Sequence, residues 1–127
     1  MTIDASLWFE KAQLAGQASR RELDAGNLPA AANRAYFSLY PFLTGLLIQR
    51  GHTPPADRGH WPHSRMHALV RTHLRASYQK HLSMALLNRL YRYRSLADYG
   101  DHRLLDAATL SGVLRQLGTV IGSQWRG

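Results

Sequence analysis

Arginine and histidine occur together in RYRSLADYGDH, residues 92–102, and this pair of side chains is suited to metal-free cleavage of RNA. A histidine can exchange a proton with a ribose 2′-hydroxyl or the leaving oxygen, while an arginine stabilises charge on phosphorus. We expect Arg94, His102 and Asp98 to form such a catalytic group if the helix unwinds at Gly100 and folds the histidine back. The alternative is structural, because Asp98 lies one helical turn after Arg94 and can pair with it.

Further basic side chains on both sides of this segment are candidates for phosphate contact. Arg89 and Arg92 interleave with tyrosines, as basic residues do on surfaces that bind single strands. His63, His67, Arg71 and Arg75 recur every fourth residue and so should form one row on a helix, which a solvated face would also explain. The candidate nucleic-acid-binding residues are Arg89, Arg92, Arg103, His67, Arg71 and Arg75.

Three histidines, His60, His63 and His67, raise the question of a metal site. Cysteine is absent and Asp57 is the one carboxylate close to them in the sequence, so the ligand set is too thin and we expect no metal and no cofactor. We expect His63 with Ser64 to begin a helix, where the side chains would satisfy free backbone amides.

Composition limits the classes of function that remain. The chain has 127 residues, no cysteine and a net charge of +8, and 14 of its 16 basic residues are arginine. Thiolate chemistry is therefore excluded, and an arginine-rich excess favours contact with a polyanion, although a GC-rich genome would also raise arginine over lysine. We expect one domain over residues 1–127, a cytoplasmic location and no membrane segment, because no apolar stretch is long enough to span a bilayer.

The elements that must position these residues are helices, since sustained strand alternation is missing. Helices are expected at about residues 6–25, 29–50, 62–75, 79–99 and 104–123. Leu7, Leu14 and Ala18 should form the buried side of the first helix, and Gly45 should let a neighbour approach the second helix closely. Short connections between long helices predict an all-α fold, an antiparallel helical bundle of about five helices.

The helix expected at about residues 79–99 is apolar on a second side. Met84, Leu87 and Tyr91 fall away from its main leucine row, and an apolar arc this wide indicates contact with two partners. We expect a homodimer that covers this flank and brings Arg94 and His102 of the two copies into a shared cleft, with coverage by another part of the same chain as the alternative.

Three blocks of the sequence, AANRAYFSLYPFLTGLLIQRG, the HS of WPHSRMHALV, and LYRYRSLADYG, resemble the signature of the HEPN domain family. The name stands for higher eukaryotes and prokaryotes nucleotide-binding. The third block looks like the RxxADY segment of its prokaryotic branch. The resemblance implies a bundle of about five helices, usually a homodimer, that interacts with RNA or nucleotides in a toxin-antitoxin or defence system.

Many members of that family are metal-independent ribonucleases, with four to six residues between the catalytic arginine and histidine. Here seven residues separate Arg94 from His102, so the sequence leaves open whether this protein is an enzyme. The resemblance implies as the alternative a non-catalytic interaction module that partners or regulates a nucleotidyltransferase.

Overall fold

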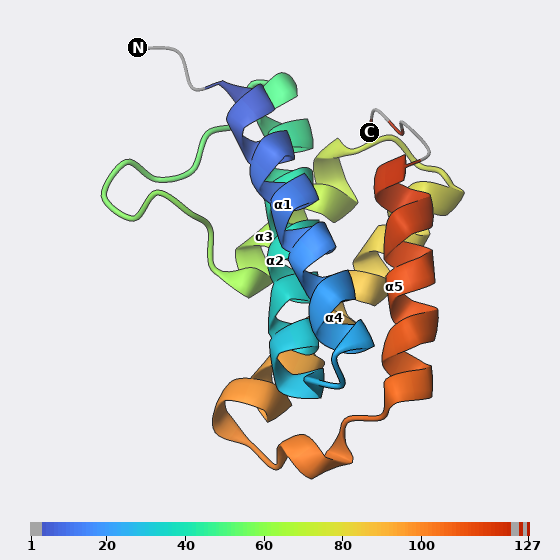
Figure 1. The fold of residues 1–127 in the computed structure, drawn as a ribbon. Helices are drawn as coiled ribbons and strands as arrows, with labels where there is room; N and C mark the ends of the chain where they lie inside the picture. The colour runs from blue at the N-terminus through green and yellow to red at the C-terminus, as the bar shows by residue number, and fades with distance from the viewer. Residues whose placement is uncertain (1–3, 123–124, 126) are drawn as a thin grey trace.

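The computed structural model is all-helical in the ranges that it describes, residues 4–122, 125 and 127. Its elements are α1 (Ala5–Asp24), α2 (Leu28–Gln49), α3 (His63–His73), α4 (Tyr78–Tyr99), a short 3₁₀ helix η1 (His102–Leu104) and α5 (Ala107–Gly122), arranged as in Figure 1. The predicted five-helix, all-α fold is confirmed. None of the helices in these ranges combines the length and apolar character that a bilayer crossing requires.

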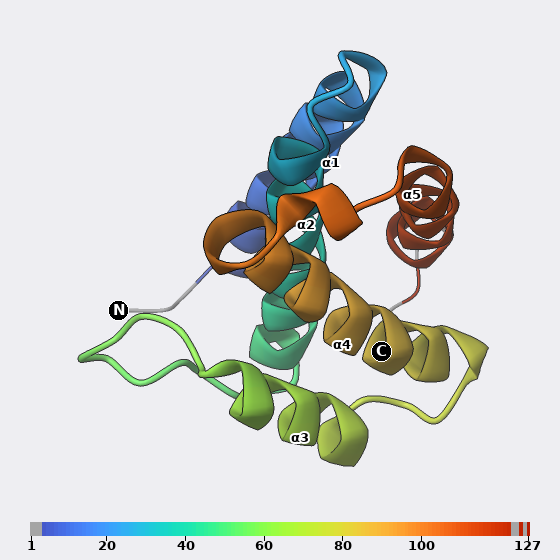
Figure 2. The ribbon, with the colours of Figure 1, turned by 90° about the horizontal axis from the view of Figure 1, so that it is seen from below.

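The central element of the bundle is α2, as its nearly continuous apolar sequence predicts. Leu39, Leu43 and Leu47 are fully buried, and the helix lies between α1 and α4 (Figure 2). Gly45 has no side chain, and a Cβ atom there would lie 2.5 Å from Cε1 of Phe9 on α1. The expected close approach at Gly45 is therefore confirmed, and it fixes the position of α1 against α2.

The buried side of α1 differs from the prediction. Leu7 and Leu14 are 51% and 57% exposed, whereas Ala12 and Ser19 are buried. Hydroxyl groups bridge the two helices here, since Ser19 Oγ donates to the carbonyl oxygen of Ala31 at 2.7 Å. The backbones of α1 and α2 are so close that only small side chains fit between them. The prediction that the large hydrophobic residues of α1 form its buried side was therefore wrong.

The predicted helix ends agree with the structure to within two residues except at the last helix. Leu104 lies in η1 and α5 begins at Ala107, because Asp106 accepts hydrogen bonds from the amide and hydroxyl of Thr109 at 2.9 and 2.7 Å. The expected end at Ser123 falls outside the described residues.

The second apolar side of α4 is covered from within the chain. Leu87 is fully buried in the core cluster that also holds the buried residues of α3, and Met84 packs against that cluster. Tyr91 stacks on His63 of α3 with ring centroids 3.9 Å apart. The inference of a second copy from this flank was therefore wrong, because α3 provides the second contact, and the homodimer itself stays a prediction.

Candidate functional site

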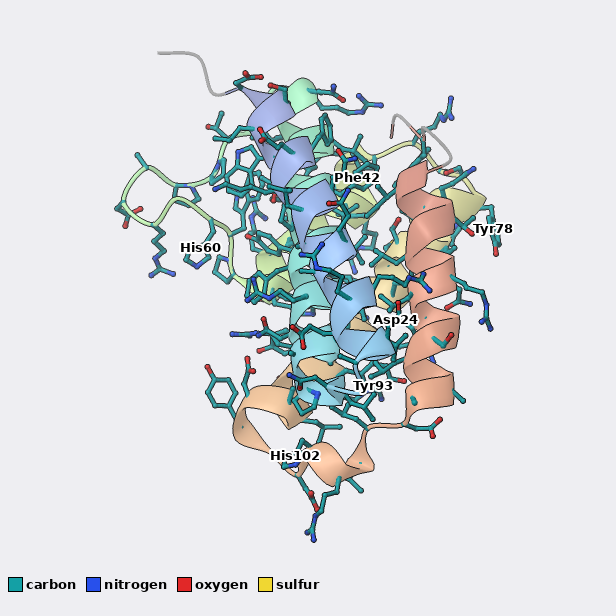
Figure 3. The ribbon with its side chains drawn as sticks, viewed as in Figure 1. Asp24, Phe42, His60, Tyr78, Tyr93 and His102 are labelled. Carbon is teal, nitrogen blue, oxygen red and sulfur yellow. The ribbon has the colours of Figure 1, made fainter. Side chains whose placement is uncertain are left out.

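A groove of about 910 Å³ lies between α1, α2, the loop before α3 and the second half of α4. Aromatic and basic side chains dominate its walls, and we call it the aromatic groove. Its aromatic residues are Trp8, Tyr36, Phe37, Tyr40, Trp61 and Tyr91, and its basic residues include Lys11, Arg34, His60, His63 and Arg94. Figure 3 shows His60 on the loop that forms one edge of this region.

Arg94 lies among aromatic rings at the α4 wall of the groove. Its guanidinium carbon is 5.7 Å from the ring centroid of Tyr36 and 5.3 Å from that of Phe37. The Nε atom is 3.5 Å from Oδ2 of Asp98, so the ion pair predicted from the four-residue spacing is confirmed. That Nε is buried and has no hydrogen-bond partner, which shows that Asp98 pairs with the charge without satisfying the donor.

The carboxylate of Asp98 is shared with a second helix. Nδ2 of Asn33 donates to Asp98 Oδ2 at 3.0 Å, and Oδ1 of Asn33 accepts from Nε and Nη2 of Arg34 at 3.1 and 2.6 Å. One amide and one carboxylate therefore hold two guanidinium groups at the same groove. Two positive charges with a single negative charge between them leave an excess that favours an anion.

A chain of hydrogen bonds connects α2, α3 and α4 at the floor of the groove. Tyr36 Oη is 3.2 Å from Nδ1 of His63, and Nε2 of His63 is 3.2 Å from Oδ1 of Asn88. Nδ2 of Asn88 is in turn 3.3 Å from Nε2 of His67. These bonds fix the plane of the His63 ring, which also stacks on Tyr91.

The chemistry of the partners assigns the protons in this chain. Burial raises the pKa of Tyr36, so its phenol stays neutral and donates, while burial lowers the pKa of His63, with His67 acting in the same direction and Asn88 against it. A neutral His63 therefore accepts at Nδ1 and donates from Nε2 to the amide oxygen of Asn88. The amide nitrogen of Asn88 then donates to His67.

The loop at the groove edge is anchored by Tyr40. Its hydroxyl accepts from the backbone nitrogen of Trp61 at 2.7 Å and donates to the Trp61 carbonyl oxygen at 2.6 Å. Burial raises the pKa of Tyr40 to about 12, so this hydroxyl keeps its proton. Because both polar backbone groups of Trp61 are tied to one buried side chain, the indole and the adjacent His60 are held at the groove.

The structure pairs two of the predicted catalytic residues, Arg94 and Asp98, but does not place His102 at the aromatic groove with them. Arg94 lines the aromatic groove, but His102 is exposed in η1 and is not among the groove residues. Figure 3 places His102 at the opposite end of the molecule from Phe42. The predicted catalytic group of Arg94, His102 and Asp98 therefore remains a prediction.

The predicted basic residues are spread over several surfaces. Arg92 is exposed, Arg103 is bound to Asp101 at 2.8 Å, and Arg71 is exposed on α3. The expected row on α3 is incomplete, because His63 and His67 bond to Asn88 and Arg75 follows the end of the helix. Arg89 lies on another side of α4.

The sequence reasoning missed Asn33, Tyr36 and Asn88, and it misassigned His63. The expected helix start at His63 is confirmed, but Pro62 is the residue before α3 and no side chain caps the helix, so the expected capping role of His63 was wrong. The sequence did carry a signal for the site, because Arg34 and Tyr36 lie in the first block that resembles the family signature and His63 lies in its HS pair. Within the described ranges, no group of three or more His, Asp or Glu side chains could hold a metal ion.

Comparison with known proteins agrees with the helical architecture. Residues 5–118 match a protein family whose description is HEPN domain. No curated protein sequence matches the chain.

Proposed function

Because the chain belongs to the HEPN domain family, we propose that it binds RNA or a nucleotide in the aromatic groove. The observation that carries this proposal is the placement of Arg34 and Arg94 beside a wall of aromatic rings. No carboxylate is among the groove-lining residues that the structure describes. The net charge of +8 adds a long-range attraction for a polyanion.

Each part of a nucleotide has a matching group in the groove. Guanidinium groups bind phosphate with two parallel donors, and Arg94 is already oriented by its contacts with Tyr36 and Phe37. Bases stack on aromatic rings when they are unpaired, and Tyr91 is 39% exposed for such a contact. The ligand that fits is therefore single-stranded RNA or a free nucleotide rather than a duplex.

Binding of a fluorescent single-stranded RNA of eight nucleotides tests the proposal, with fluorescence anisotropy as the measurement. Arg94→Gln should weaken binding by about tenfold or more, since a charge-assisted hydrogen bond contributes about 1.5–3 kcal/mol. Arg21→Gln is the matched control, because Arg21 is exposed on α1 outside the groove and its loss changes the net charge equally. Equal losses in both variants would assign binding to net charge and refute the groove.

We propose cleavage of the bound RNA by Arg94 and His102 of two different copies as the catalytic form of this function. If the two residues act across a homodimer, Arg94→Ala and His102→Ala are each inactive alone. A mixture of the two should recover part of the activity, because mixed dimers carry one intact site. Wild-type cleavage with no recovery in a mixture that forms mixed dimers would reject the shared site.

The alternative proposal is a non-catalytic module that partners a nucleotidyltransferase in a toxin-antitoxin or defence system. The seven residues between Arg94 and His102 favour it, because they exceed the separation found in the ribonucleases of the family. Co-purification with a nucleotidyltransferase encoded next to this gene is the test. His102→Ala should then leave partner binding unchanged, and RNA should remain uncut by the wild type.

A further inference from the structure

A second groove lies on another side of α4, where α5 packs against it. Successive helical residues turn by about 100°, so Arg89 points away from Tyr91 and Arg94, which face the aromatic groove. The second groove has a volume of about 560 Å³, and we call it the α4–α5 groove. Figure 2 shows α5 and the loop before α3 on opposite sides of the molecule.

Two arginines line the α4–α5 groove, one from each helix. Nη2 of Arg89 donates to the hydroxyl of Tyr93 at 3.3 Å, and Nη1 of Arg115 donates to Oγ of Ser111 at 3.3 Å. Within the described part of the chain, neither guanidinium has a carboxylate partner. Both guanidinium groups are therefore oriented by neutral hydroxyls. Their positive charge is not offset by a carboxylate, and their other N–H donors can bind an anion.

The acid nearest to this groove in the sequence is already engaged. Asp106 accepts from the amide and the hydroxyl of Thr109 at the start of α5. Its charge caps α5, and Asp106 is not among the residues that line the groove. Gln116 and Thr119 add polar groups to the rim. The lining is thus polar and cationic, in contrast to the aromatic groove.

Gly112 keeps the α4–α5 groove open. Glycine inside a helix costs about 0.5–1 kcal/mol relative to alanine, and this glycine has no left-handed backbone that would require it. A Cβ atom at Gly112 would meet Nη2 of Arg115 at 3.7 Å, an ordinary contact, and nothing closer. Neither backbone conformation nor close packing demands glycine here, whereas a larger side chain would fill the groove.

We infer that the α4–α5 groove binds a phosphate group of the RNA backbone, as a second contact for a strand held in the aromatic groove. The inference rests on the proposed function. A planar guanidinium on each side matches the charge and geometry of a phosphodiester. The open, polar lining without aromatic walls suits a backbone that passes across it, and it offers no ring on which a base could stack.

The affinity for single-stranded RNA of 4, 8, 12, 16 and 20 nucleotides tests this inference. Wild-type affinity should rise when the strand becomes long enough to reach both grooves. The double variant Arg89→Gln with Arg115→Gln should keep the affinity for four nucleotides and show no gain with length. Its log–log slope of affinity against salt for long RNA should be smaller by about 0.7 for each phosphate that the variant no longer neutralises.

Two further variants separate the groove from net charge. Gly112→Leu fills the floor without changing any charge, and it should also abolish the gain with length. Arg20→Gln with Arg21→Gln removes two exposed charges of α1 and should leave the gain intact. Circular dichroism confirms that each variant keeps the helical content of the wild type, since a leucine is favoured over glycine in a helix.

The outcomes distinguish this inference from the proposed function. If four nucleotides bind through Arg94 but longer RNA gains nothing, the α4–α5 groove is refuted and the aromatic groove stands. If four nucleotides fail to bind while Arg89 and Arg115 determine the affinity of long RNA, the aromatic groove fails instead. Tight binding of inorganic phosphate that requires both arginines, without any gain with length, would assign the groove to a free anion and overturn the backbone contact.

Discussion

Alanine in place of Gly45 and alanine in place of Gly118 are the same chemical change, and we expect opposite effects on stability. Alanine is favoured over glycine inside a helix by about 1 kcal/mol, and a Cβ at Gly118 meets nothing within 4 Å, so Gly118→Ala should gain about that amount. At Gly45 the new Cβ lies 2.5 Å from Phe9 Cε1, whereas carbon atoms prefer about 3.5–4.0 Å, so the ring must retreat by about 1 Å.

Phe9 cannot retreat freely, because its ring packs on Phe42 with centroids 5.7 Å apart. Overpacking of this kind costs about 1–3 kcal/mol, which at least cancels the gain in helix propensity and leaves Gly45→Ala destabilised by up to about 2 kcal/mol. Trp8 and Lys11, which lie on either side of Phe9 in α1, line the aromatic groove. A displacement of Phe9 that moves α1 should therefore also weaken RNA binding in this groove.

Thermal unfolding followed by circular dichroism measures both variants. For 127 residues, an unfolding entropy of about 2.1 cal/mol/K per residue gives about 0.27 kcal/mol/K, so 1 kcal/mol moves Tm by about 4 °C. Gly118→Ala should therefore melt about 4 °C higher than the wild type and Gly45→Ala up to about 8 °C lower. A gain of equal size in both variants would refute the close contact of α1 with α2 on which the groove wall depends.

Two other predictions concern groups at the groove. Because burial lowers the folded-state pKa of His63 below its usual 6.5, the unfolded chain binds more protons between the two values. The free energy of unfolding should thus decrease as pH falls below about 6.5 and level off below the pKa of His63 in the folded state. Urea titrations from pH 8 to 5 measure this decrease, and His63→Gln should lack the part of it that comes from His63. Tyr40→Phe leaves both backbone groups of Trp61 buried without a partner and should cost about 2–3 kcal/mol in urea unfolding. Tyr91→Phe, at a hydroxyl with no hydrogen bond in the described part, should change stability by less than about 0.5 kcal/mol, and similar losses in both would contradict the anchoring role of Tyr40.

Local spacing was enough to predict most of the fold. Helical periodicity located α2 and its central place, because an apolar residue on every side of a helix requires neighbours on every side. It failed on α1, where the contact depends on Ala12, Ser19 and Gly45 being small. Periodicity assigns the buried face of a helix to its large hydrophobic residues, whereas two backbones in close contact require small residues between them. Leu7 and Leu14 were therefore placed on the wrong side of α1.

The site was predictable only where it lies on one element. Arg94 and Asp98 are four residues apart on α4, so their pairing follows from helix geometry. The chain from Tyr36 through His63 to Asn88 joins α2, α3 and α4, and the contributing residues are 25 or more positions apart. No spacing rule connects such residues, because their proximity is created by packing of the helices.

The wide apolar arc of α4 has a consequence for how anions reach this protein. The arc arises from contacts with α2, α3 and α5 of the same chain, and Leu86, Leu87 and Leu90 are buried by them. Two arginines of this helix lie at seams between its neighbours, whereas Arg92 is exposed away from both grooves. Arg94 emerges at the seam with α2 and the loop before α3, and Arg89 at the seam with α5. Arg94 and Arg89 therefore line two different grooves, so we expect a ligand that contacts both arginines to be an extended chain rather than a single nucleotide.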